Sequence, residues 1–121
     1  EYAFTVAAAK NIEVQTDHSQ KLYTVKLPMN QRKNIYLIAK EAINNAVKYS
    51  GATELKITVQ QKNGSFLLKI ADNGKGFNIK KVKKGNGLVN MEERATEISA
   101  DLTINTEEGK GTSVSILSKI P

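Results

Sequence analysis

The stretch Glu41-Ala-Ile-Asn-Asn-Ala-Val-Lys-Tyr-Ser50 forms the second half of a predicted helix that runs from about Asn30 to Ser50. Apolar residues recur along this helix at i, i+3, i+4, i+7, i+8 and i+11, which is the spacing of one continuous buried stripe. The residues of the stripe are Ile35, Ile38, Ala39, Ala42, Ile43 and Ala46. The rest of the fold is expected to pack against this stripe.

A second face of the same helix is polar. Glu41, Asn45 and Lys48 stand at i, i+4 and i+7, so they lie on one side of the helix. This face offers a carboxylate, a neutral oxygen ligand and a cation, which suit a divalent metal together with a polyphosphate. A solvated polar face is the alternative interpretation, and the helix alone favours it.

Composition limits the class of protein. The chain has 121 residues, 40% of them hydrophobic, which suits a single domain over residues 1–121 with one core. No run reaches the length of a membrane span, and the start does not resemble a signal peptide. The absence of cysteine excludes disulfides and thiolate metal sites. The net charge of +6 lacks an accompanying aromatic platform, so we expect no nucleic-acid partner.

The segment before the helix is predicted to contain a helix end and two extended stretches. Residues 1–10 are typical of a helix end, residues 12–16 alternate like a strand, residues 17–20 suit a turn, and residues 21–27 form a second extended stretch. His18, the single histidine, falls in this turn and is interpreted as an ordinary surface side chain.

Capping and turn residues bound the next elements. Asn30 is the expected N-cap of the helix, and Gly51 suits the position just after its end. Residues 54–61 and 65–72 both alternate, and Asn63-Gly64 between them is a strong hairpin signal.

The second strand of this hairpin ends in an inward-facing carboxylate. Period two places Asp72 on the same face as Phe66, Leu68 and Ile70. An unpaired charge there would cost several kcal/mol, so Asp72 needs a partner, and a ligand could supply it. Satisfaction within its own glycine-rich turn is the alternative.

A lysine-rich loop over residues 78–87 has no apolar period, and a helix is predicted from Leu88 to Ser99. Gly85 and Gly87 precede this helix, where free N–H groups and the helix dipole favour a phosphate. We interpret Lys80 to Lys84 as a solvated lid that raises the local attraction for anions.

The chain closes with a strand at 102–106, a turn at 107–111 and a strand at 112–117. Antiparallel hairpins and segregated helices together predict an α+β two-layer sandwich. Its sheet should be mixed, mostly antiparallel, with about five strands, covered by about three helices.

Four signals thus follow one another along the chain. They are Glu41…Asn45…Lys48, Asp72-x-Gly74-x-Gly76, Gly85-x-Gly87 and Gly109-x-Gly111-Thr112. In this order they resemble the N, G1, G2 and G3 motifs of the ATP-binding catalytic domain of sensor histidine kinases, within the GHKL ATPase superfamily and its Bergerat-type fold. The run Gly85-Asn-Gly-Leu-Val-Asn-Met-Glu-Glu-Arg-Ala95 is similar to the GxGLxxMxERA signature of the nitrate- and lipid-sensing kinases.

The resemblance implies roles for the helix residues. Asn45 would ligate a Mg²⁺ that bridges the phosphates of ATP, and Glu41 would order a metal-bound water or act as a base. Lys48 would approach the phosphates. Tyr49 stands where many of these kinases have histidine, although tyrosine also occurs there, and it is included among the nucleotide-binding residues.

The resemblance also implies an adenine pocket and a lid. Asp72 would accept a hydrogen bond from the adenine amino group, Gly76 would let the base approach closely, and Thr112 would help close the pocket floor. Gly74 is included among the nucleotide-binding residues. Gly85 to Gly87, with Leu88, would form the lid hinge and meet the phosphates. The lid lacks the phenylalanine-containing F box that marks the other large class of histidine kinases.

The implied activity is transfer of the γ-phosphoryl group of ATP to a histidine on a separate dimerisation domain, which this chain does not contain. The expected partners are that domain and a response regulator. The location would be cytoplasmic, either in a free protein or in the cytoplasmic part of a membrane-bound sensor. This domain would make no direct membrane contact, and in isolation it would be monomeric.

Two alternatives stay open. An anti-sigma-type serine kinase, which acts mainly by sequestering a transcription factor, shares the superfamily motifs, and the Met91-Glu-Glu-Arg-Ala95 run favours the histidine kinase. A degenerate domain without ATP binding is disfavoured by the intact motifs. Glu92, Glu93 and Arg94 fit either a plain helix surface or a role in lid or partner docking.

Overall fold

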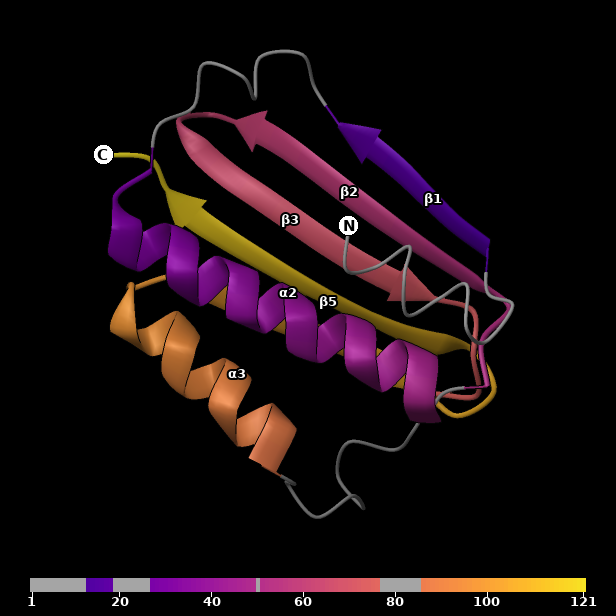
Figure 1. The fold of residues 1–121 in the computed structure, drawn as a ribbon. Coiled ribbons are helices and arrows are strands. Elements are labelled where there is room, and N and C mark those ends of the chain that lie inside the picture. Colours follow the sequence, from indigo (N-terminus) through magenta and orange to yellow (C-terminus); the bar gives the residue numbers. More distant parts are fainter. Residues whose placement is uncertain (1–12, 19–26, 50, 77–85) are drawn as a thin grey trace.

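The computed structural model describes residues 13–18, 27–49, 51–76 and 86–121. Figure 1 shows a sheet with two helices against one of its faces. The elements in chain order are β1 (Glu13–His18), α2 (Met29–Tyr49), β2 (Glu54–Lys62), β3 (Ser65–Asp72), α3 (Asn86–Glu97), β4 (Asp101–Glu107) and β5 (Gly111–Lys119).

The sheet has the strand order β1-β2-β3-β5-β4, and only the β1–β2 pair is parallel. The predicted α+β sandwich with a mixed, mostly antiparallel sheet is therefore confirmed. Two helices are described. The predicted helix at residues 1–10 lies outside the described residues, as does most of the predicted strand at 21–27.

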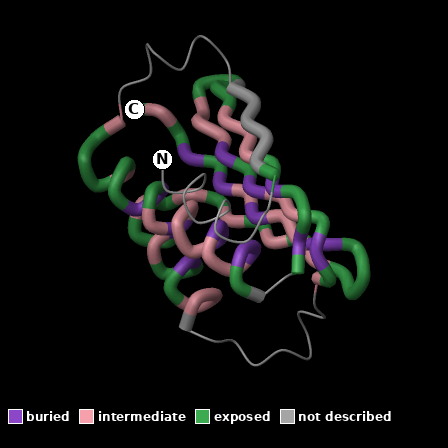
Figure 2. The backbone as a smooth tube through the Cα atoms, turned by 45° about the vertical axis from the view of Figure 1, so that its right-hand side comes forward, coloured by how far each residue is buried: buried purple, intermediate pink, exposed green. Residues whose placement is uncertain are grey.

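The core lies between the helices and the sheet. Five of the six residues in the predicted α2 stripe are buried, and Ala39 is partly buried against them. The sheet contributes alternate residues of β3 and β5, and α3 contributes Met91 and Ala95. Figure 2 shows the buried segments gathered where helices and sheet face each other. This packing fixes the angular position of α2, and with it the direction of its polar face.

The predicted turn chemistry is confirmed. Gly51 follows α2 with a φ of 69°, the left-handed conformation expected just after a helix end. Asn63 and Gly64 have φ values of 51° and 78°, so both central residues of the β2–β3 turn are left-handed, as a type I′ hairpin requires.

Strands β2, β4 and β5 extend one or two residues beyond the predicted ranges, and three other boundaries differ in ways that bear on the site or the topology. Helix α2 begins at Met29, and its first bond runs from Arg32 N to the Pro28 carbonyl at 3.0 Å, so Asn30 lies inside the helix and is not its N-cap. Strand β1 continues to His18, where we expected a turn, because this segment pairs with β2 up to that residue. Helix α3 spans 86–97 where 88–99 was predicted.

Candidate functional site

Helix α2 carries the predicted polar face. Glu41 and Asn45 are half-buried, and Lys48 is exposed in the last helical turn. Tyr49 is the final residue of the helix, and its side chain lies outside the described part. Because Ala42 and Ala46 on the neighbouring stripe are buried, rotation of α2 away from this orientation would expose the core.

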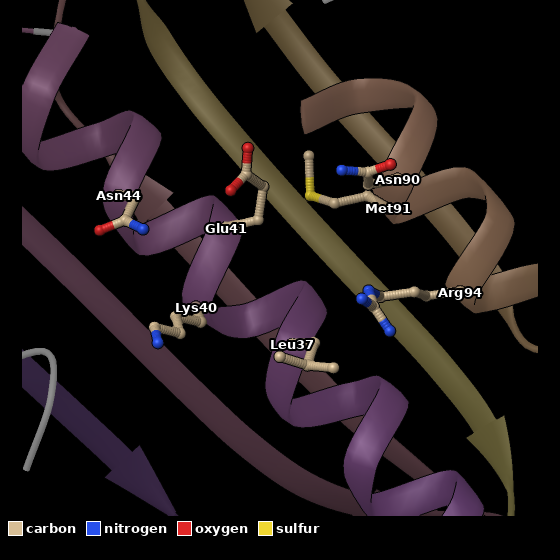
Figure 3. Close-up of a pocket in the computed structure, with 7 residues that line it drawn as sticks. All are labelled: Leu37, Lys40, Glu41, Asn44, Asn90, Met91 and Arg94. Atoms are coloured by element: carbon tan, nitrogen blue, oxygen red, sulfur yellow. The ribbon is translucent and has the colours of Figure 1, made fainter. Parts of the chain in front are cut away.

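The first contact between predicted motifs joins Glu41 to Gly87. A Cβ added at Gly87 would overlap Glu41 Oε1 and would stand 3.1 Å from Glu41 Cδ. The carboxylate therefore occupies the space that any side chain at position 87 would need, at the start of α3. Figure 3 shows Glu41 extending from α2 toward α3.

A groove of about 190 Å³ runs between the two helices beside this contact. Glu41 forms part of its wall, so the carboxylate is half-buried but reachable. Figure 3 shows the remaining walls, which come from both helices. The lining residues are Leu37, Lys40, Glu41, Asn44, Asn90, Met91 and Arg94.

The kinase-like signature run forms the face of α3 that packs on α2. Met91 and Ala95 are buried and Leu88 is partly buried, which follows the spacing of one helical face. Arg94 Nη1 donates to Asn34 Oδ1 at 3.5 Å, and Asn34 is almost fully buried. Arg94 is thus a link between the helices, while Glu92 and Glu93 are exposed.

Asp72 lies on the core-facing side of β3, as predicted. Its carboxylate accepts hydrogen bonds from Gly74 N at 2.8 Å and from the backbone N–H of Thr112. Burial raises the pKa of Asp72 above its ordinary value of 3.8, and the two hydrogen bonds only partly oppose that effect. Part of the need for a partner is therefore met within the fold, and the carboxylate remains half-buried.

Glycines bring the loop after β3 against the β4–β5 turn. A Cβ added at Gly76, whose φ is 62°, would overlap the Glu107 carbonyl oxygen and stand 2.9 Å from the Gly111 carbonyl oxygen. Gly109 N donates to the Lys75 carbonyl at 2.5 Å. The backbone of the β4–β5 turn therefore requires glycine at position 76, independently of any nucleotide base that would approach it.

Gly111 and Thr112 complete this corner. Gly111 has a φ of 88°, and an added Cβ would overlap the Asp72 carbonyl oxygen. Thr112 pairs with Asp72 across β3 and β5, and its hydroxyl lies 2.8 Å from the Thr106 hydroxyl. The G1-like and G3-like motifs are thus joined in one corner of the sheet.

Two predicted glycines, Gly74 and Gly85, complete the set of candidate site residues. Gly74 is buried, with its N–H bonded to Asp72. Gly85 lies outside the described residues.

A second hollow, of about 440 Å³, lies beside the same corner. Its lining combines Lys69, Ala71 and Ser113, which alternate with the core-facing residues of β3 and β5, with Asp72 and Thr112 of the corner itself.

Sequence reasoning missed two polar residues. Asn34 belongs to α2 but matched no motif, and a single amide inside a helix gives no signal that a distant arginine will reach it. Asn73 is the unspecified position of Asp72-x-Gly74, yet its Oδ1 accepts the N–H groups of Thr53 and Glu54, each at 2.9 Å. An Asn before a glycine indicates a turn, and this pattern was the one feature of the sequence that pointed to Asn73.

The donor groups of α2 suit magnesium that arrives with a phosphate. Asn45 supplies one neutral oxygen and Glu41 one carboxylate, four residues apart on the same helix face. The described residues contain no cluster of three His, Cys, Asp or Glu side chains that could hold a metal by themselves. Mg²⁺ commonly keeps several waters and binds through one or two protein oxygens plus phosphates, and these residues fit that mode.

Comparisons with known proteins agree with the geometry. Residues 30–121 match the family described as histidine kinase-, DNA gyrase B- and HSP90-like ATPase. Sensor protein VraS of Staphylococcus aureus (strain COL) is 33% identical over 108 residues, which cover 88% of this chain and 30% of that protein. Sensor protein VraS of Staphylococcus saprophyticus is 38% identical over 92 residues, 75% of this chain and 26% of that protein. The chain thus spans less than a third of the curated relatives it matches.

Solved structures share the fold. The histidine kinase domain of the blue-light activated kinase from Erythrobacter litoralis EL346 has a TM-score of 0.82 at 17% identity, covering 98% of this chain and 57% of that one. A nucleotide-free catalytic domain of histidine kinase ThkA has a TM-score of 0.77 at 14% identity, covering 98% and 88%. The chain therefore belongs to the family of histidine kinase-, DNA gyrase B- and HSP90-like ATPases, and it has the sensor-kinase form of the ATP-binding domain that its motifs predict.

Proposed function

We propose that this chain binds Mg-ATP and donates the γ-phosphoryl group to a histidine on a separate dimerisation domain, in two-component signal transduction. The observation that carries the proposal is the pairing of motifs distant in sequence. Glu41 of α2 meets Gly87 of α3, and Asp72 of β3 is bonded to Thr112 of β5. Family membership supports ATP as the ligand.

On the metal side, Asn45 would hold Mg²⁺, which supplies charge neutralisation to the phosphates when bound. Glu41 would order a water or accept a proton, and exposed Lys48 would approach the phosphates. Tyr49 would contact the nucleotide near the helix end. Because phosphoryl transfer depends mostly on positioning and charge stabilisation, these residues have little covalent chemistry to perform.

On the base side, Asp72 would accept a hydrogen bond from the adenine amino group. Its raised pKa fits this role, because a carboxylate that is partly desolvated gains from a new donor. Gly74, Gly76 and Thr112 would shape the pocket around the base. Gly85, Gly87 and Leu88 would hinge the lid and bring backbone N–H groups to the phosphates.

The proposal extends to the context of the domain. Residues 1–121 would act as one ATPase domain in the cytoplasm, where ATP is available, with the dimerisation domain and a response regulator as partners. We expect the isolated domain to be monomeric and without nucleic-acid or direct membrane contacts. Among the described residues, neither helix is long and apolar enough to cross a membrane.

The test is transfer of label from γ-labelled ATP to a dimerisation domain that contains its acceptor histidine, supplied in trans. We expect labelling that needs both this chain and Mg²⁺, that resists alkali and is lost in acid, as a phosphohistidine should be. The Asn45→Ala variant should fold and fail to transfer. Label that resists acid and is lost in alkali would indicate phosphoserine, and would favour the anti-sigma-type serine kinase.

A further inference from the structure

Within the described part of the loop after β3, residues 73–76, the side chain of Asn73 makes three hydrogen bonds. Its Oδ1 accepts hydrogen bonds from the backbone N–H groups of Thr53 and Glu54, each at 2.9 Å, and its Nδ2 donates to Thr53 Oγ1 at 3.0 Å. These distances are those of well-formed hydrogen bonds. One amide therefore binds two consecutive residues that lie 19 and 20 positions earlier in the chain.

The residues that Asn73 binds connect two parts of the candidate site. Helix α2 ends at Tyr49, Gly51 follows it, and Thr53 directly precedes Glu54 at the start of β2. Thr53 also accepts, through its carbonyl, the N–H of Glu13 at the start of β1. The Asn73 side chain thus links the segment that follows α2 to the chain position directly after Asp72.

Burial does not account for this arrangement. Asn73, Thr53 and Glu54 are all exposed, so water could satisfy the same groups at little cost. Net stabilisation from exposed hydrogen bonds is small, about 1 kcal/mol each or less. A side chain that makes three of them at the surface contributes mainly by fixing geometry.

The loop is also tied from its other side. Gly109 N bonds to the Lys75 carbonyl, and Gly76 packs on the backbone of the β4–β5 turn. Those contacts set the position of the loop relative to β4 and β5, but they do not reach α2. Asn73 supplies the side-chain tie on the α2 side.

We infer that Asn73 is a positioning residue that sets the distance between Asp72 and the metal-binding face of α2. The inference rests on the proposed function, because it assigns Asp72 to the base and Asn45 to the metal. Nucleotide would have to span both groups at once. A side chain that fixes their separation therefore acts on affinity and on base selectivity without touching the ligand.

The test compares three variants of the chain by calorimetric titration with Mg-ADP and Mg-GDP. Asn73→Ala removes all three bonds and should weaken ADP binding about tenfold, a loss of about 1.4 kcal/mol, with reduced preference for ADP over GDP. Asn73→Asp keeps both acceptor bonds to Thr53 and Glu54 and should restore affinity to within about threefold of wild type. Thr53→Val removes only the Nδ2 bond and should behave like Asn73→Asp.

Amide hydrogen exchange in the nucleotide-free chain gives a second readout. Exchange at Thr53 and Glu54 should accelerate in Asn73→Ala and stay slow in Asn73→Asp. A merely structural role would lower the unfolding temperature of Asn73→Ala while leaving the ADP/GDP preference unchanged, and that result would overturn the inference. Unchanged exchange at both amides would overturn it as well.

The role of Asn73 and the proposed function are tested by different outcomes. If wild type binds Mg-ADP and Asn73→Ala binds it equally well with the same selectivity, this inference alone is wrong. If wild type binds no nucleotide, the proposed function is wrong and the inference falls with it.

Discussion

Replacing Gly87 with alanine should slow phosphoryl transfer while it leaves the stability of the fold nearly unchanged. Gly87 stands in the first turn of α3, and its φ is not among the left-handed values, so alanine fits the backbone there. The added Cβ would overlap Glu41 Oε1 and stand 3.1 Å from Glu41 Cδ. Since these atoms are the far end of a flexible side chain, the carboxylate should move and the helices should stay in place.

Two opposing terms set the stability change. Alanine gains up to about 1 kcal/mol of helix propensity over glycine. Pushing Glu41 off its rotamer costs about 0.5–1.5 kcal/mol. The net change in unfolding free energy should therefore stay within about 1 kcal/mol of zero. A displacement of about 1 Å at a catalytic group can lower a rate about 10²-fold, and we expect a loss of this order in phosphoryl transfer.

The assay is the rate of phosphoryl transfer to the dimerisation domain, beside thermal unfolding of each variant. The matched control is a cycle with Glu41→Ala, which removes the atoms that the new Cβ meets. Gly87→Ala should cost little further activity in the Glu41→Ala background and should stabilise it by its propensity gain. Transfer by Gly87→Ala at the wild-type rate would refute the assignment of Glu41, and equal losses in both backgrounds would show that the glycine acts in another way.

Two further substitutions test other parts of the site. Burial raises the pKa of Asp72 in the folded chain above 3.8, so the folded chain binds a proton on this carboxyl more tightly than the unfolded chain does. Protonation of Asp72 therefore contributes to stability fully below pH 3.8, and this contribution is lost as the pH rises through the raised pKa. Asp72→Asn should therefore raise the unfolding temperature at pH 7 and remove the stabilisation that protonation of Asp72 supplies in acid, and a lower unfolding temperature at pH 7 would contradict the desolvation argument. Arg94→Met leaves the buried Asn34 oxygen without its donor and should cost about 1–3 kcal/mol in urea unfolding, against less than about 0.5 kcal/mol for the exposed Glu93→Gln control. Equal stability of the two variants would mean that the Arg94–Asn34 contact contributes nothing.

The fold was predictable where local rules decide it. The apolar stripe of α2 follows from periodicity, and the left-handed Gly51, Asn63 and Gly64 follow from turn chemistry. The N-cap at Asn30 was wrong because Pro28 already supplies the carbonyl for the first helical bond. His18 was assigned to a turn because the pairing of β1 with β2 joins segments far apart, which local patterns do not reveal.

The contacts of the site were less predictable than its residues. Motif order identified Glu41, Gly87, Asp72 and Thr112, but no periodicity indicates that Glu41 fills the space over Gly87. The Arg94–Asn34 bond joins side chains 60 residues apart, so its detection requires the packed helices. How these residues act on a nucleotide stays a prediction.

The glycine motifs illustrate the same limit. The sequence associated Gly76 with approach of the base, and the fold adds a backbone reason that is independent of any ligand, since the β4–β5 turn leaves no room for a Cβ. A glycine in a sequence indicates that space is needed, but only the packed chain identifies which atoms fill it.

The most direct measurement is calorimetric titration of this chain with ADP, with and without Mg²⁺, beside the Asp72→Asn variant. We predict saturable binding by wild type that strengthens with Mg²⁺, and a large loss of affinity in Asp72→Asn despite its intact fold. Absence of binding by wild type at high nucleotide concentration, or equal affinity of the two proteins, would contradict the assignment of this site to ATP.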